Sequence, residues 1–191
     1  MSNHRCSWCG SDPLYTAYHD EEWGVPVYEN ETKHFENLVL ESAQAGLSWI
    51  TILKRRKTYR LAYEGFDPYQ IASWGEKDVQ RLLQNPGVIR NRLKIESSIN
   101  NARCFLKVKE EFSSFSDYYW HFQEGRPIIN HWDNEAEIPS KTPLSETISK
   151  DMKKRGFTFL GPTVTYANMQ SLGMVNDHIR SCFRYKEVMK K

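Results

Sequence analysis

Four residues near the two ends of the chain have side chains that bind transition metals. Cys6 and His19 lie near the start of the sequence, and His178 and Cys182 lie near its end. If a helix follows Asp177, the four-residue spacing places His178 and Cys182 on one face, where both reach a single ion. Two thiolates and two neutral imidazoles would form a closed, structural Zn²⁺ site that joins the chain ends.

A third nearby cysteine leaves the choice of thiol open. Cys6 and Cys9 form a Cys-x-x-Cys motif, which could supply two metal ligands or a redox pair. The redox interpretation requires a βαβ setting that the sequence does not show. At the spacing of His178 and Cys182, a buried cysteine and a helix-capping histidine are the commoner arrangement. Cys104, in a helical segment, is interpreted as a core residue.

Aromatic residues make up 13% of the chain, and several stand among polar residues. Tyr15, Tyr18 and His19 have i, i+3 and i+4 spacing, so they share one face of a helix that Asp12 and Pro13 begin. Such rings suit stacking on bases or cations, although aromatic residues also fill ordinary cores. One helix could therefore contact both a binding pocket and the metal site.

The net charge of +2 is too small to indicate a nucleic-acid-binding protein by itself. The isoelectric point is near 8.3, whereas a strong electrostatic footprint usually gives a domain a value above about 9. Charge runs are more often solvated surface than binding sites. Any phosphate contact must come from two local clusters: Lys54, Arg55, Arg56 and Lys57, and Lys150, Lys153, Lys154 and Arg155.

The elements that would position these residues are helices. Apolar residues recur at three- and four-residue steps, as in Phe35, Leu38 and Val39, and alternating strand patterns are scarce. Thr142 repeats the cap-then-proline signal of Asp12, and Asn176 or Asp177 could cap a last helix. The polar stretch 126–143 is the one long connection expected.

The length of 191 residues fits a single domain with an ordinary core. The sequence has no run of about 18 apolar residues, and Met1 to Cys6 lack an apolar signal core. We therefore expect a soluble, cytoplasmic protein with no membrane partner.

Four segments carry specific motifs: YTAYHDEEWGVP at 15–26, LESAQAGLSW at 40–49, KKRGFTFLGPT at 153–163 and GMVNDH at 173–178. In these segments the chain resembles the DNA-3-methyladenine glycosylase I family, a branch of the helix-hairpin-helix glycosylases. The resemblance spans nearly the whole chain and is weakest between about residues 112 and 143.

The resemblance implies a two-lobed, all-α helix-hairpin-helix glycosylase-like fold, with one catalytic domain over residues 1–191. It implies a structural zinc bound by Cys6, His19, His178 and Cys182, which would join the N- and C-terminal segments. The implied activity is hydrolysis of the N-glycosidic bond of 3-methyladenine in alkylated double-stranded DNA, with the free base as product. Cys9 departs from the family pattern. We expect a monomer.

The resemblance also assigns roles in a base pocket. Glu41 contacts the base, Tyr18 and Trp49 line or stack in the pocket, and Tyr15, Trp8 and Trp23 lie nearby. Adenine methylated at N3 is cationic while attached to the sugar, so a carboxylate and aromatic faces would favour it over neutral adenine. Glu41 could stabilise the base or assist an attacking water. The alternative is that Glu41 is a solvated helix charge and the two tyrosines are core residues.

Two turns are candidates for DNA contact. Gly156 and Gly161 flank an apolar turn before an expected helix, so backbone N–H groups there could bind a phosphate. In the turn after Glu41, Gly46 would permit close approach and Leu47 would help fill the gap left by the flipped base. Asp177 lies where related glycosylases place an aspartate, but its neighbour His178 is an expected metal ligand, so we expect no catalytic role for it.

Two other functions remain open from the residues. A non-enzymatic, zinc-stabilised module could bind methylated bases without releasing them. A small zinc hydrolase would need an open metal position, which two cysteines and two histidines do not leave. No lysine stands out as a Schiff-base nucleophile, so we expect a monofunctional glycosylase that does not cleave the strand.

Overall fold

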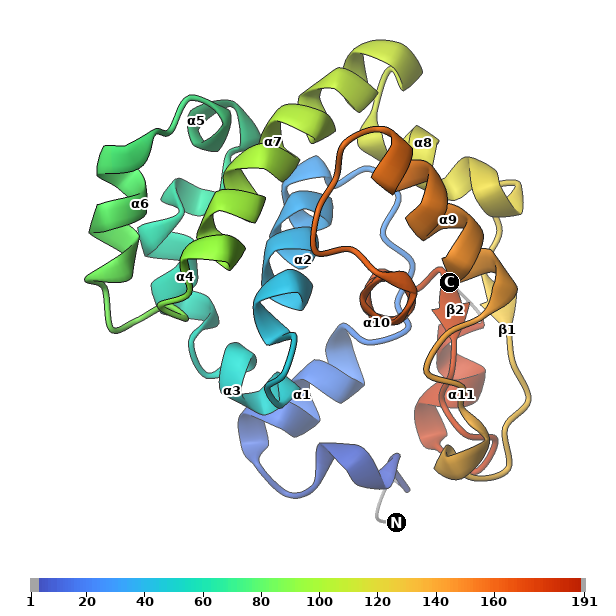
Figure 1. Cartoon of the computed structure of the whole chain (residues 1–191). Coiled ribbons are helices and arrows are strands. Elements are labelled where there is room, and N and C mark those ends of the chain that lie inside the picture. Colours follow the sequence, from blue (N-terminus) through green and yellow to red (C-terminus); the bar gives the residue numbers. More distant parts are fainter. Residues whose placement is uncertain (1–3, 190–191) are drawn as a thin grey trace.

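The computed structural model describes residues 4–189, which form a mostly helical fold (Figure 1). The helices of the first half are α1 (Pro13–Glu21), α2 (Glu31–Gln44), α3 (Trp49–Leu53), α4 (Arg56–Ala62), α5 (Pro68–Ala72) and α6 (Glu76–Leu83). Those of the second half are α7 (Arg92–Phe112), α8 (Phe115–Trp120), α9 (Pro143–Lys154), α10 (Pro162–Ser171) and α11 (Phe183–Val188). Short 3₁₀ turns are Ser7–Cys9, Glu64–Phe66, His121–Gln123 and Glu135–Glu137.

Helices α2 and α10 lie at the centre of the molecule (Figure 1). Helices α4 to α6 lie to one side, with the long helix α7 crossing over them, and α9 and α11 lie to the other. Helix α2 packs against α7, α8 and α10, so ten consecutive residues from His34 to Ala43 are buried. Any polar side chain on this stretch must therefore find a partner inside the protein.

The helix starts predicted from cap signals are confirmed at two places. The Asp12 carboxylate accepts a hydrogen bond from the Leu14 N–H at 3.0 Å, and Pro13 is the first residue of α1. The Thr142 hydroxyl accepts from the Ser145 N–H at 3.2 Å, and Pro143 begins α9. Both starts depend on local interactions alone, which is why the sequence indicates them.

The prediction that a helix follows Asp177 is wrong. Residues Val175–Asn176 form a short strand, β2, that pairs in parallel with β1 (Ile128–Ile129). The chain then turns, and α11 begins only at Phe183, with Cys182 as its N-cap. His178 and Cys182 consequently lie in a loop rather than on one helical face. Because of this strand pair, the fold is mostly helical and not all-α as expected.

The expected long connection is present between α8 and α9. It contains β1 and the 3₁₀ turn Glu135–Glu137 and is otherwise irregular. Among residues 4–189, no helix is long and apolar enough to cross a membrane.

Candidate functional site

The four predicted metal ligands meet in one buried cluster. Cys6 precedes the first 3₁₀ turn, His19 lies in the last turn of α1, and His178 and Cys182 lie before α11. One candidate ligand atom of each residue lies within 4.8 Å of the others. The Cys182 Sγ is 3.5 Å from His19 Nε2 and 3.6 Å from His178 Nδ1, and Cys6 Sγ is 3.7 Å from His178 Nδ1.

These distances suit a tetrahedral metal ion. Zn–S bonds of about 2.3 Å and Zn–N bonds of about 2.0 Å at tetrahedral angles separate sulfur and nitrogen by roughly 3.5 Å. The other nitrogen of each imidazole also has a partner: His19 Nδ1 is 2.8 Å from Asp20 Oδ1, and His178 Nε2 is 3.0 Å from the Trp23 carbonyl oxygen. Such outer partners fix the ring orientation of histidine ligands. The cluster therefore fits a single closed metal site.

The thiols of the cluster differ in their acidity. Hydrogen bonds from Cys6 and from both histidines lower the pKa of Cys182, which favours its thiolate. The pKa of Cys6 is raised by its hydrogen bond to Cys182 and by burial. Cys9 is not part of the cluster, and its Sγ instead contacts the Cys6 carbonyl oxygen at 3.1 Å.

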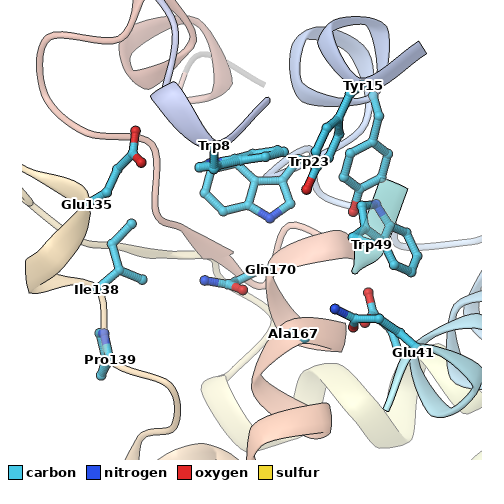
Figure 2. Close-up of a pocket in the computed structure, with 12 residues that line it drawn as sticks. Trp8, Tyr15, Trp23, Glu41, Trp49, Glu135, Ile138, Pro139, Ala167 and Gln170 are labelled. Carbon is cyan, nitrogen blue, oxygen red and sulfur yellow. The ribbon is translucent and has the colours of Figure 1, made fainter. Parts of the chain in front are cut away.

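An aromatic cavity of about 420 Å³ adjoins the metal cluster, within the usual size range of small-molecule pockets. In Figure 2, Trp8, Tyr15 and Trp23 form one wall, Glu41 and Trp49 stand on another, and Ala167 and Gln170 come from α10. All six residues predicted for the base pocket line this cavity: Trp8, Tyr15, Tyr18, Trp23, Glu41 and Trp49.

Glu41 projects into the cavity from the last turn of α2. Its side chain is only 2% exposed, and its Oε2 has no hydrogen-bond partner in residues 4–189. Burial raises the pKa of Glu41 to about 8, and a hydrogen bond from Ser171 partly opposes this effect. The indole Nε1 of Trp49 is also buried without a partner in that part of the chain. Two unpaired polar groups in one cavity indicate a polar ligand.

The rings around the cavity contact one another and the metal cluster. The Trp49 ring lies 5.4 Å from that of Tyr18. Trp8 lies 4.9 Å from Trp23, which in turn lies 4.6 Å from the imidazole of His178. Because the rings of one wall contact a candidate metal ligand, the metal cluster supports the shape of the cavity.

The turn after α2 lies beside the cavity. Gly46 has a φ of +80°, a conformation that L side chains rarely adopt, and Leu47 is 40% exposed. The Lys94 ammonium donates to the carbonyl oxygens of Ala43 and Ala45, at 2.8 and 2.6 Å. The turn is therefore held by α7 while its tip faces solvent.

The second predicted turn connects α9 and α10. Gly156 has a φ of +92°, and Gly161 is the N-cap of α10 without a side-chain cap. The Asn101 side chain accepts from the Thr158 N–H and donates to the Thr158 carbonyl, both at 2.9 Å. The turn is thus fixed from α7, and the first N–H groups of α10 have no capping side chain.

Several residues of the predicted basic clusters are engaged in ion pairs. Arg56 pairs with Glu22 at 2.7 Å and with Glu36 at 2.6 Å. Arg155 pairs with Glu111 and Asp151, both at 2.7 Å. Neither arginine is therefore a free phosphate ligand.

Asp177 is buried, and both of its carboxylate oxygens already accept hydrogen bonds. Its Oδ1 accepts hydrogen bonds from Asn130 and Trp132, at 2.7 and 2.8 Å, and its Oδ2 accepts from Tyr166 and Gln170, both at 2.7 Å. Four donors leave its oxygens no capacity for a substrate. Asp177 instead fixes the connection 126–143 against α10.

One wall of the cavity was not predicted from the sequence. Part of the connection between α8 and α9 closes the side opposite Glu41 (Figure 2). No local sequence signal indicates this, because the segment is weakly periodic and is placed by contacts with distant residues. The missed lining residues are Gln44, Glu135, Ile138, Pro139, Ala167 and Gln170.

Comparisons with known proteins agree in family and fold. The family model described as methyladenine glycosylase matches residues 8–185. DNA-3-methyladenine glycosylase 1 of Escherichia coli K12 is 47% identical over 181 residues, which cover 95% of this chain and 96% of that protein.

Two solved structures are similar over almost their whole length. A crystal structure of 3-methyladenine DNA glycosylase I superposes with a TM-score of 0.91 at 50% identity and covers 94% of this chain and 98% of that one. A tyrosine-to-phenylalanine variant of 3-methyladenine DNA glycosylase I, in complex with 3-methyladenine, gives 0.90 at 33% identity, with 94% and 96% covered.

Proposed function

The chain belongs to the methyladenine glycosylase family, and we propose that the cavity around Glu41 is where this DNA-3-methyladenine glycosylase holds the base that it releases. The reaction hydrolyses the N-glycosidic bond of 3-methyladenine in alkylated DNA and leaves an abasic site for base excision repair. An enzyme of this kind must take the damaged base out of the duplex and hold it in a pocket. The base then leaves as free 3-methyladenine.

The rings of the cavity supply the stacking surfaces that an extruded base requires. Stacking on aromatic side chains is worth about 1–3 kcal/mol per base, comparable with the cost of unstacking the base. We assign this contact to Trp49 and Tyr18, and we place Tyr15, Trp8 and Trp23 around the remaining edge. The 3-methylated base is cationic before release, so electron-rich ring faces favour it over unmodified adenine.

Glu41 supplies charge recognition. The Glu41 oxygen that faces the cavity can accept a hydrogen bond from an adenine N–H group, and the carboxylate attracts the cationic base. Burial disfavours the ionised form of Glu41 in the free protein, and the positive charge of the bound base favours it. Neutral adenine offers no such compensation, so the cavity discriminates between the two bases by charge.

The two solvent-facing turns suit contact with the duplex. We assign a phosphate contact, made without reading sequence, to the backbone N–H groups at Gly161 and the start of α10, where no side chain caps the helix. Gly156 shapes the turn before them, since its own N–H donates to the Lys153 carbonyl oxygen. Gly46 and Leu47 form the turn that we place in the gap left by the extruded base. The extruded nucleotide must pass this turn to reach the cavity. The turn would therefore fill the gap while the cavity holds the base.

We propose zinc as the ion of the metal cluster, since two cysteines and two histidines are typical ligands of structural zinc. Cys6, His19, His178 and Cys182 would hold it and leave no open position for a reacting water. When bound, the ion contributes its binding energy to folding and joins the chain ends. The proposal includes a single catalytic domain over residues 1–191, a monomer and no strand cleavage.

The observation that carries the proposal is the unpaired, buried carboxylate of Glu41 inside an aromatic cavity. Its test compares 3-methyladenine release from methylated DNA by wild type, Glu41→Gln and Glu110→Gln. Glu110 is exposed on α7, outside the cavity lining, and serves as the matched control. We expect kcat/KM to fall at least tenfold for Glu41→Gln and to be unchanged for Glu110→Gln. Full activity of Glu41→Gln would remove Glu41 from either role.

A second function, binding methylated bases without releasing them, shares the same cavity. It predicts affinity for methylated DNA together with no free base from folded, metal-loaded wild type. The same assay therefore separates the two functions.

A further inference from the structure

Behind Glu41, where α2 meets α8 and α10, buried polar atoms are concentrated. His34 Nδ1, Asn37 Nδ2 and Glu41 Oε2 on α2 have no hydrogen-bond partner in residues 4–189. The same holds for the Tyr119 hydroxyl of α8 and for both amide atoms of Asn168 on α10. These side chains are at most 3% exposed.

These groups lie on three helices, of which α2 packs against both α8 and α10. Asn37 lies four residues before Glu41, so both lie on one face of α2. The ring of Tyr119 lies 6.3 Å from that of His34, and the Glu41 charge adds to the effect of burial in raising the pKa of Tyr119. Asn168 is one turn before Ser171, whose hydroxyl donates to the Asn168 carbonyl oxygen at 3.0 Å and opposes the rise in the pKa of Glu41.

The protein cannot leave so many polar atoms unpaired without a large loss of stability. Each buried donor or acceptor without a hydrogen-bond partner destabilises the folded protein. A buried water needs two to four polar partners, and this cluster offers amide donors, an amide acceptor, a carboxylate oxygen and a hydroxyl. The chemistry of the cluster is therefore that of an internal solvent site.

We propose that Asn37, Tyr119 and Asn168 form an internal water site behind the base pocket, and that Asn168 is a positioning residue that acts on Glu41 through this water. The amide groups of Asn37 and Asn168 donate to the water oxygen, which leaves the water protons for Glu41 Oε2. A hydrogen bond donated to a carboxylate stabilises its charged form. The site holds the inner oxygen of Glu41 still and favours its ionisation, while the outer oxygen faces the base.

Within residues 4–189, no cation is among the groups that couple to Glu41. The titratable groups that couple to it are tyrosines of α1 and α8, while α3 and α10 present an indole and a hydroxyl. His34, on the same helix, has its pKa lowered to about 4 by burial and is neutral at pH 7. The groups that face Glu41 from these elements are Tyr15, Tyr18, Trp49, Tyr119 and Ser171.

The inference rests on the proposed function for its kinetic test and is independent of it for its structural test. The variants are Asn168→Leu, which removes both amide atoms at similar volume, and Tyr119→Phe, which removes only a hydroxyl. In both we expect the acid limb of the kcat/KM profile to move to higher pH. A shift of about one pH unit lowers base release near pH 7 by up to tenfold, with recovery toward wild type near pH 9. A merely structural role would lower activity equally at every pH.

The water itself is observed by high-resolution crystallography and by nuclear Overhauser transfer from water to the Asn168 amide. We expect an ordered water bonded to Glu41 in wild type and its loss in Asn168→Leu. An unchanged pH profile in folded Asn168→Leu, or a crystal structure in which these side chains pair directly with no water between them, would overturn the inference. If wild type releases no base, the proposed function fails, and the crystallographic result still decides the water site.

Discussion

At the scale of single residues, Glu41 is a buried carboxylate whose Oε2 has no hydrogen-bond partner in residues 4–189. A carboxylate on a helix is usually solvated, yet Glu41 lies in the fully buried stretch of α2. The sequence does not reveal this burial, because α2 carries other glutamates in the same helical pattern. Only the packing of α2 between α8 and α10 removes Glu41 from water.

This burial predicts a pH-dependent stability difference between wild type and Glu41→Gln. The folded protein raises the pKa of Glu41 from 4.5 to about 8. Between these values the unfolded chain has released this proton and the folded chain retains it, so the wild-type free energy of unfolding falls as the pH rises. Glutamine has no such titration. Relative to wild type, the variant gains roughly 2–4 kcal/mol of stability between pH 5 and pH 8.

Denaturant unfolding of both proteins at several pH values measures this difference. The control is Glu110→Gln, whose stability relative to wild type should vary little with pH. A constant difference between wild type and Glu41→Gln from pH 5 to pH 8 would show that Glu41 is not buried as described.

At the scale of elements, the turn between α2 and α3 yields a separate prediction. Leu47 is exposed at the tip of a turn that Lys94 holds from behind. Leu47→Ala shortens the group that we propose to fill the gap in the duplex but leaves the cavity intact, since Leu47 is not among its lining residues. We expect base release from DNA to fall about threefold to thirtyfold, in line with the few kcal/mol of unstacking, and affinity for free 3-methyladenine to be unchanged.

Calorimetry with the free base and kinetics on methylated DNA separate these two effects. Leu61→Ala is the matched control, because Leu61 is 81% exposed on α4. Equal losses in both assays would mean that Leu47 shapes the base cavity instead.

Elements with local signals were predictable from the sequence, and elements placed by distant contacts were not. Asp12 and Thr142 cap their helices through neighbouring N–H groups, so both starts are visible in the sequence. Asp177 resembles a helix cap, but its side chain is taken by four donors from distant segments. The connection 126–143 closes the cavity for the same kind of reason.

The predicted residues of the site show the same division. The motifs that carry the family resemblance hold five of the six pocket residues and two of the four metal ligands; Trp8, Cys6 and Cys182 lie outside them. The ion pairs of the two arginines were not predicted, because Glu22 and Glu111 lie far in sequence from Arg56 and Arg155. Only Asp151, four residues before Arg155, is a local partner. A run of charges does not indicate which members already have partners.

At the scale of the whole molecule, the metal cluster joins the two ends of the chain and supports the pocket wall. We expect one zinc ion per wild-type chain and loss of the ion in Cys6→Ser. The binding energy of such an ion is folding energy of several kcal/mol, so chelation should lower the melting temperature and loosen Trp8 and Trp23 together. Elemental analysis and a thermal scan followed by tryptophan fluorescence measure both effects.

Cys9→Ser is the control for this experiment, since Cys9 is buried but lies outside the cluster. It should retain a full complement of metal. A wild-type chain that is fully folded without metal would refute the structural role of the cluster.

The most direct test of the whole account is the identity of what the protein releases from methylated DNA. Purified wild type is incubated with DNA treated with a methylating agent, and the released material is separated by chromatography. If the proposed function is right, we expect free 3-methyladenine, with the DNA strands left intact at abasic sites. Absence of any released base from folded, metal-loaded protein would contradict it, and release accompanied by nicked strands would contradict the hydrolytic mechanism without strand cleavage.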